Sequence, residues 1–94
     1  MNYEQDFYEK VAQRKIGEKT YFRMSDVVLL AKRDFDYLRE MKPHMADLQT
    51  HDKKIWIDLT DVRIVLRDAG TKDAANYYEA LFGAMTRQLS TVLN

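Results

Sequence analysis

The two histidines of this chain lie close together, within the stretch PHMADLQTHD. On a helix, His44, Asp47 and His51 would share one face, and their imidazole and carboxylate groups would suit zinc or nickel. The set offers no fourth ligand and lacks the glutamate of an HExxH pattern. Pro43 and its polar neighbours are instead typical of a solvated connector. We therefore expect neither a metal ion nor another cofactor.

No other residues form a recognisable catalytic arrangement. Cysteine is absent, no serine lies in a GxSxG turn, and the three glycines are isolated from one another. Asp26 and Asp61 occupy equivalent positions in two similar segments and could act as paired carboxylates in acid–base chemistry. A simpler explanation is that each offsets the positive N-terminal end of a helix. We therefore expect that the protein is not an enzyme.

One group of basic residues has a spacing that suits phosphate binding. Arg63 and Arg67 are four residues apart on one expected helix, away from its apolar stripe. The candidate DNA-binding residues are Arg63, Arg67, Lys53, Lys54 and Lys72. The carboxylates among them, which would partly cancel their charge, are Asp58, Asp61, Asp68 and Asp73. The group is therefore either a nucleic-acid contact or a solvated face held by salt bridges, and both interpretations remain open.

Trp56 and its equivalent Tyr21 are the candidate partner-binding residues. Strand alternation places Trp56 on the same face as Asp58. Either an N-terminal helix covers the indole with Tyr3 and Phe7, or the ring is partly exposed and anchors a protein partner. The sequence leaves both alternatives open.

These residues belong to two similar segments, KTYFRMSDVVLLAKR (residues 19–33) and KIWIDLTDVRIVLRD (residues 54–68), which align without a gap. Each begins with alternating apolar and polar residues, which predict a strand, and continues into a helix with Ser25 or Thr60 as the expected N-cap. The predicted buried stripes of the two helices are Val27, Leu30 and Ala31, and Val62, Val65 and Leu66. A duplicated strand–helix unit predicts that the two strands pair in a two-stranded antiparallel sheet.

The remaining segments are predicted to be mostly helical. We expect a helix over residues 3–15 that stops near Gly17, and a first repeat helix that runs to about Met41. Residues 43–52 are expected to be a polar connector, with one or two helical turns. Gly70 should end the second repeat helix, and Thr71 should cap the last one. The predicted fold is a mostly helical α+β domain with a two-stranded sheet and a long C-terminal helix.

The last helix has apolar residues at alternating spacings of three and four. They are Ala75, Tyr78, Phe82, Met85, Leu89 and Val92. This spacing predicts either a helix that packs on its own domain or a homodimer seam formed by the residues from Tyr78 onward.

Length and composition limit the class of protein. The 94 residues suit a single domain, residues 1–94, and 46% hydrophobic with 32% charged residues is typical of a globular chain. The 15 basic residues balance the 15 acidic ones, so any nucleic-acid binding must use a local patch. Residues 1–10 do not form a secretory signal, and no apolar run approaches the length of a membrane span. We expect a cytoplasmic protein.

The segment IWIDLTDVRIVLRDAGTKDAANYY, residues 55–78, resembles the opening of the KilA-N and BRO-N domains of phage repressors and antirepressors. The resemblance lies in an aromatic strand, an LTD helix start, a glycine and a second helix start. It implies DNA binding by a regulator of a mobile element. The alternative function is an adaptor or inhibitor that docks on a host protein complex through the aromatic face of its sheet.

Overall fold

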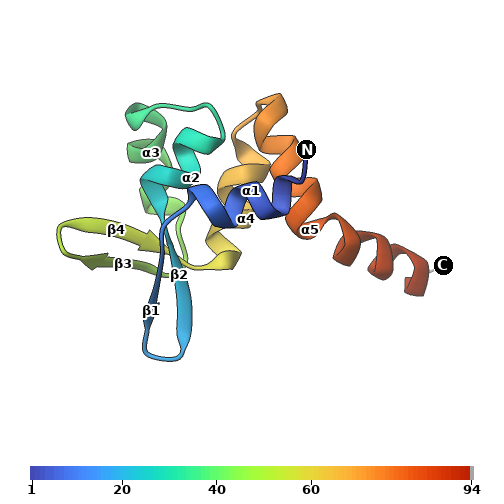
Figure 1. Cartoon of the computed structure of the whole chain (residues 1–94), viewed down its shortest axis with the longest axis horizontal. Coiled ribbons are helices and arrows are strands. Elements are labelled where there is room, and N and C mark those ends of the chain that lie inside the picture. The colour runs from blue at the N-terminus through green and yellow to red at the C-terminus, as the bar shows by residue number, and fades with distance from the viewer. Residues whose placement is uncertain (94) are drawn as a thin grey trace.

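The structure, a computed structural model, describes residues 1–93, with the side chains of residues 1–84 (Figure 1). Its first half contains α1 (Tyr3–Lys10), β1 (Gln13–Ile16), β2 (Lys19–Arg23), α2 (Met24–Leu30) and α3 (Phe35–Met41). After a 3₁₀ turn (Lys42–His44) come β3 (Leu48–His51), β4 (Lys54–Ile57), α4 (Leu59–Asp68) and α5 (Lys72–Leu93). None of the described helices has both the length and the apolarity needed to cross a membrane.

The sheet has four antiparallel strands in the order β1-β2-β4-β3, so the prediction of a two-stranded sheet is wrong, although the α+β class is right. The two missed strands, β1 and β3, were predicted as the end of a helix and as a connector. Both are short and mostly polar, and each is fixed by pairing with the next strand across a tight turn. Tertiary pairing therefore overrides the weak local pattern.

The duplicated unit is larger than the matching segments. The first repeat consists of β1, β2, α2 and α3, and the second repeat consists of β3, β4, α4 and α5. Each is a β-hairpin followed by two helices. The central strands β2 and β4 pair antiparallel with Phe22 opposite Ile57, which are equivalent residues of the two repeats. The repeats are therefore related by a local two-fold axis at this pair.

The helix starts differ from the predicted ones. Asp58, not Thr60, is the N-cap of α4, and its carboxylate accepts a hydrogen bond from the Asp61 amide at 3.0 Å. In the first repeat Arg23 holds the N-cap position, and Ser25 lies inside α2. The prediction of Ser/Thr caps is therefore wrong, because each helix begins earlier than the strand pattern indicated.

The helix expected to reach Met41 is broken into α2 and α3. Lys32 has a left-handed backbone with φ of +59°, which ends α2, and the Asp34 carboxylate then caps α3 through the Tyr37 amide at 3.0 Å. In the second repeat Gly70, with φ of +75°, ends the α4 segment as predicted.

The helices pack against one face of the sheet (Figure 1). Phe22 and Ile57 lie at the base of this core, and the ring of Phe7 on α1 packs on Phe22 with centroids 5.4 Å apart. The predicted stripe of α4 is confirmed as buried. On α5 the core-facing residues include Ala74 and Tyr77, whereas Ala75 of the predicted seam is exposed.

Candidate functional site

Arg63 and Arg67 lie on the exposed side of α4, opposite the side that packs in the core. Their four-residue spacing keeps both guanidinium groups on one side of the helix. They line a hollow of about 340 Å³ together with Ile64 and Asp68. The structure therefore brings the two arginines of the predicted patch together.

The start of α5 extends this basic surface. The Thr71 hydroxyl accepts a hydrogen bond from the Ala74 amide at 3.1 Å, which confirms Thr71 as the cap of the last helix. Lys72 follows at the first helical position, and it lines a hollow of about 600 Å³ together with Arg67. Lys72 therefore joins the arginines across the turn between the two helices.

Tyr78 of α5 fixes the position of Arg63. The Arg63 Nε donates a hydrogen bond to the Tyr78 hydroxyl at 3.3 Å. We refer to the surface formed by Arg63, Arg67, Lys72 and Tyr78 as the α4–α5 face. Tyr78, a predicted dimerisation residue, thus has a partner within its own chain.

Two of the four carboxylates expected to offset this charge are buried. Asp61 is 0% exposed and Asp58 is 9% exposed, and both accept hydrogen bonds inside the protein. Asp68 stays exposed in the hollow beside the arginines, and Asp73 is half-buried in the first turn of α5. The opposing charge on the α4–α5 face is therefore reduced but not removed.

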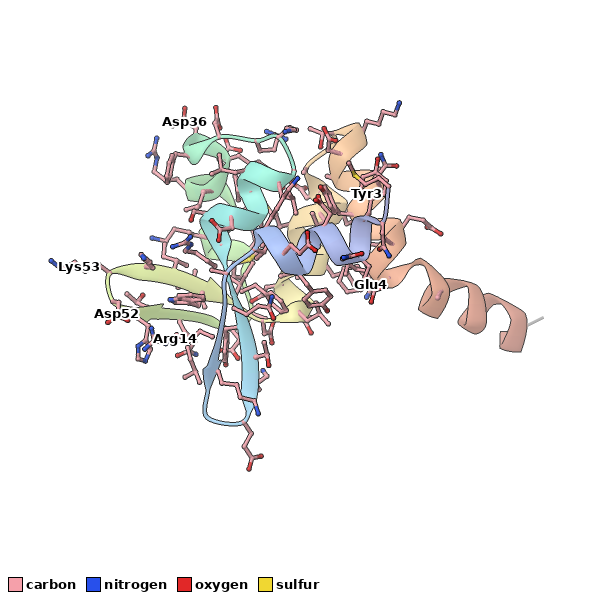
Figure 2. The ribbon with its side chains drawn as sticks, in the orientation of Figure 1. Tyr3, Glu4, Arg14, Asp36, Asp52 and Lys53 are labelled. Atoms are coloured by element: carbon pink, nitrogen blue, oxygen red, sulfur yellow. The ribbon has the colours of Figure 1, made fainter. Side chains whose placement is uncertain are left out.

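Lys53 and Lys54 do not join this face. They lie at the β3–β4 turn, at the tip of a hairpin that projects to the side of the molecule away from α5 (Figure 2). The side chains of Arg14 and Asp52 meet nearby in an ion pair of 2.6 Å. The five cations predicted as one DNA-binding group thus form two separate sets.

The rings of Trp56 and Tyr21 are largely removed from solvent, at 6% and 4% exposed. Neither ring belongs to the core cluster, and Tyr3 and Phe7, expected to cover Trp56, pack on Tyr77 and Phe22. The guanidinium of Arg14 lies 5.9 Å from the centroid of the indole instead. Little ring surface is left to contact a partner.

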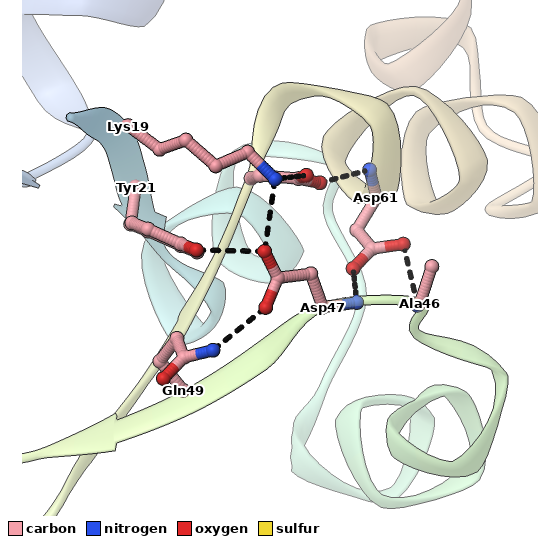
Figure 3. Close-up of polar contacts among 7 residues, drawn as sticks. Lys19, Tyr21, Ala46, Asp47, Gln49 and Asp61 are labelled. Atoms are coloured by element: carbon pink, nitrogen blue, oxygen red, sulfur yellow. Dashed lines mark hydrogen bonds and ion pairs between the residues drawn. The ribbon is translucent and has the colours of Figure 1, made fainter. Parts of the chain in front are cut away.

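A cluster of polar side chains joins the two repeats (Figure 3). The Lys19 Nζ of β2 lies 2.9 Å from the Asp47 carboxylate and 3.0 Å from the Asp58 carboxylate. Asp47 also accepts hydrogen bonds from the Tyr21 hydroxyl and the Gln49 amide, both at 2.6 Å. A cavity of about 460 Å³, lined in part by Lys19 and Asp58, opens beside it.

These contacts favour one protonation state at Asp47, Lys19 and Tyr21. The hydrogen bond from Tyr21, followed by those from Lys19 and Gln49, lowers the pKa of Asp47 to about 2. The contacts with Asp47 and Asp58 raise the pKa of Lys19, and the hydrogen bond to Asp47 raises the pKa of Tyr21. An ammonium that stays charged and a phenol that stays protonated are poor bases and nucleophiles. The cluster is thus suited to holding the repeats together.

Asp26 and Asp61, the equivalent acids considered for catalysis, each bind backbone at the entrance to their own hairpin. Asp26 accepts the Ala12 amide at 2.9 Å, and Asp61 accepts the amides of Ala46 and Asp47 at 2.8 Å each. Ala12 and Asp47 are themselves equivalent positions of the two repeats. The shared carboxylates thus have a structural use.

The histidine set is not assembled. His44 ends the 3₁₀ turn and His51 ends β3, so the helical spacing that would align them does not exist. Among the residues that the structure describes, no group of three or more His, Cys, Asp or Glu is placed to hold a metal ion.

The α5 seam is described only in part. Phe82 is 6% exposed and belongs to the core of its own chain. Met85, Leu89 and Val92 lie outside the described side chains, so the dimer seam stays a prediction.

Sequence reasoning missed two features. Asp47 was considered only as a metal ligand, and Lys19 only as a repeat position; their contact crosses a long stretch of chain that no local pattern links. The second missed feature is the exposure of Leu29 on α2 and Phe35 on α3, which the sequence did not indicate because it predicted one continuous helix there. The left-handed Lys32 gives no signal in the sequence, whereas an aspartate three residues before Tyr37 is a usable cap signal.

Comparisons of this chain with protein-family models, with curated proteins and with solved structures found no match.

Proposed function

We propose that this protein is a DNA-binding regulator that contacts the phosphates of a duplex through its α4–α5 face. The observation that supports the proposal most is that Arg63, Arg67 and Lys72, contributed by two helices, lie on one exposed surface. Guanidinium and ammonium groups on a solvent-exposed surface are the usual ligands of DNA phosphates.

The connection between the helices also favours this function. Three residues, including Gly70, separate α4 from α5, as in a helix–turn–helix unit. Arg67 and Lys72 lie on either side of that turn, so both cations reach the same stretch of duplex when the turn faces it. Because the net charge of the chain is zero, the affinity must come from this local face.

The regulatory role rests on the resemblance of residues 55–78 to the opening of KilA-N and BRO-N domains, which implies a phage or another mobile element as the setting. A homodimer would match a two-fold operator. The alternative function, an adaptor that docks through the aromatic sheet face, has less support because Trp56 and Tyr21 are almost fully buried.

The two repeats supply a matched test. Arg67→Gln removes a cation of the α4–α5 face, and Lys32→Gln removes the cation at the equivalent position of the first repeat. We expect fluorescence anisotropy to show binding of a random-sequence duplex at low salt. Arg67→Gln should weaken it and lower the slope of log affinity against log salt by about 0.9, the value for one phosphate contact. Lys32→Gln should leave both unchanged.

The triple variant Arg63→Gln, Arg67→Gln and Lys72→Gln should remove most of the salt dependence, and circular dichroism should show that it remains folded. Absence of duplex binding at low salt would overturn the proposal. So would an equal loss of affinity in Arg67→Gln and Lys32→Gln, because the α4–α5 face would then be no different from any other exposed cation.

A further inference from the structure

The outer side of α4 carries one exposed apolar residue between two arginines. Ile64 is 36% exposed and lines the same hollow as Arg63 and Arg67. All the residues that line this hollow belong to α4, whereas the hollow on the first repeat is lined by residues of both α2 and α3. The outer side of α4 is therefore open to a partner, whereas α3 packs on the corresponding side of α2.

Arg63 is held by a side chain that is itself anchored. Its Nε donates a hydrogen bond to the Tyr78 hydroxyl at 3.3 Å, and the Tyr78 ring packs on Phe82 with centroids 5.5 Å apart. Phe82 belongs to the core. A guanidinium held at Nε can donate in parallel from its two terminal nitrogens, and guanine presents N7 and O6 as a pair of acceptors in the major groove. The position of Arg63 therefore suits a base as well as a phosphate.

Ile64 has no use in a contact with phosphates alone. An apolar side chain at the surface loses the hydrophobic stabilisation that burial would give it. The major groove contains one apolar group, the methyl of thymine, against which aliphatic side chains pack. Because Ile64 follows Arg63 directly on the helix, the two side chains can reach the same base pair or adjacent ones.

Charge favours α4 over α5 as the helix that enters the groove. The exposed residues on the first turns of α5 are Lys72, Ala75 and Glu79, and a carboxylate among them would face the DNA phosphates. The first exposed carboxylate of α4 is Asp68, at its last residue. A helix with its side chains is about 10–12 Å across, which matches the major-groove width of about 12 Å.

We propose that the outer side of α4 lies in the major groove and reads its bases, with Arg63 on a guanine and Ile64 on the methyl of a thymine. Tyr78 is the positioning residue for Arg63. Arg67 and Lys72, which border the turn between the helices, remain on phosphates. This inference rests on the proposed function, because it specifies which bases the α4–α5 face recognises.

Selection of sites from a library of random duplexes, with the whole chain, tests whether bases are read. We expect a preferred sequence that contains a guanine and a thymine. Replacing that guanine by adenine should weaken binding about 5- to 150-fold, the range for a bidentate contact. 7-Deazaguanine, which lacks N7, should weaken it less, and uracil, which lacks only the thymine methyl, should weaken it a few-fold. Fluorescence anisotropy measures each affinity.

Variants of the chain connect each base to its side chain. Arg63→Gln should lose the preference for guanine over adenine, and Ile64→Ser should bind thymine and uracil sites equally. Tyr78→Phe keeps the ring and removes the hydroxyl, so it should reduce the guanine preference and leave the slope of log affinity against log salt unchanged. The matched control is Leu29→Ser, at the position equivalent to Ile64 in the first repeat, which should retain both preferences. Circular dichroism should show that all four variants are folded.

The two proposals fail in different ways. Binding of random duplexes without a preferred sequence would overturn this inference and leave the proposed phosphate contacts intact. The same holds if a preferred sequence exists but Arg63→Gln and Ile64→Ser retain it, because other side chains would then read the bases. Absence of duplex binding at low salt would overturn both proposals.

Discussion

The first repeat exposes Leu29 and Phe35, whereas the second exposes Arg63, Arg67 and Lys72. Both surfaces are built on the same hairpin–helix–turn–helix scaffold, and the buried side of each first helix is mainly apolar in both copies. Duplication thus preserved what the core requires and left the outer faces free to diverge. The first repeat thus carries exposed apolar side chains where the second carries exposed cations.

Position 28 shows how this divergence is limited by packing. Val28 is 2% exposed, but the equivalent residue of the second repeat, Arg63, reaches solvent and the Tyr78 hydroxyl. Val28 lies at the contact between α2 and α3, whereas a hollow lined by Arg67 and Tyr78 opens between α4 and α5. The second helix of each repeat therefore packs differently on the first, and position 28 is buried in one repeat while position 63 is exposed in the other.

The largest expected difference between the repeats concerns their shared carboxylates. Asp61 is fully buried and accepts two backbone amides, whereas Asp26 is partly exposed and accepts one amide together with the Arg23 guanidinium. A buried hydrogen bond to a charged group contributes about 1.5–3 kcal/mol. We expect Asp61→Ala to lower the free energy of unfolding by about 3–4 kcal/mol and Asp26→Ala by about 1–2 kcal/mol.

Urea denaturation followed by circular dichroism measures both values. Equal losses of unfolding free energy in Asp61→Ala and Asp26→Ala would contradict the comparison. The two backbone amides that Asp61 accepts would then stabilise the fold no more than the single amide that Asp26 accepts.

The sequence was informative where a pattern is local and repeated. The buried stripe of α4, the end of that helix at Gly70 and the cap at Thr71 follow from spacing and residue type. The strands β1 and β3 did not, because QRKI and LQTH have little strand character and acquire it only by pairing.

The candidate site was predictable to a similar degree. Three of the five predicted cations lie on one surface. Helical spacing predicted this for Arg63 and Arg67, and the nearby start of α5 predicted it for Lys72. Lys53 and Lys54 were placed with them because they are close in sequence, but the β4 strand carries them to the far end of a hairpin. The burial of Trp56 by Arg14 likewise depends on a contact between different hairpins.

A second difference between the repeats is sensitive to pH. Asp47 belongs to the second repeat, and its equivalent in the first is Ala12, so only one hairpin entrance carries this carboxylate. Its pKa in the folded protein is lowered to about 2, chiefly by the Tyr21 hydroxyl. The unfolded pKa is about 3.9. Ionised Asp47 therefore stabilises the fold above that value, and this stabilisation is lost as the pH falls toward 2.

We expect Asp47→Asn to unfold at a lower urea concentration than the unchanged protein at neutral pH, and to show a shallower loss of stability between about pH 4 and pH 2. Tyr21→Phe removes the largest cause of the lowered pKa and should give an intermediate slope. If Asp47→Asn lost as much stability between about pH 4 and pH 2 as the unchanged protein, the Lys19–Asp47 contact would not stabilise the junction between the repeats.

The smallest expected effect is at the hairpin turns, where the two repeats differ in both residues and backbone geometry. Gly17 in the first turn has φ of +65°, whereas in the second turn both Asp52 and Lys53 have positive φ, at +51° and +62°. Two successive left-handed residues define a type I′ turn, which favours glycine at the place of Lys53. Lysine there costs about 1 kcal/mol of backbone strain, and glycine removes that strain but loses more entropy on folding.

We therefore expect opposite signs in the two hairpins. Lys53→Gly should raise the free energy of unfolding by about 0.5 kcal/mol, and Gly17→Ala should lower it by about 1 kcal/mol. Urea denaturation resolves both, with Lys53→Asn as an intermediate case because asparagine tolerates this backbone. A loss of stability in Lys53→Gly would mean that the lysine side chain stabilises the folded hairpin by more than its backbone costs. If stability rises while duplex binding weakens, the strained lysine is retained for contact with phosphate, and the second repeat binds DNA at its hairpin tip as well as at its helices.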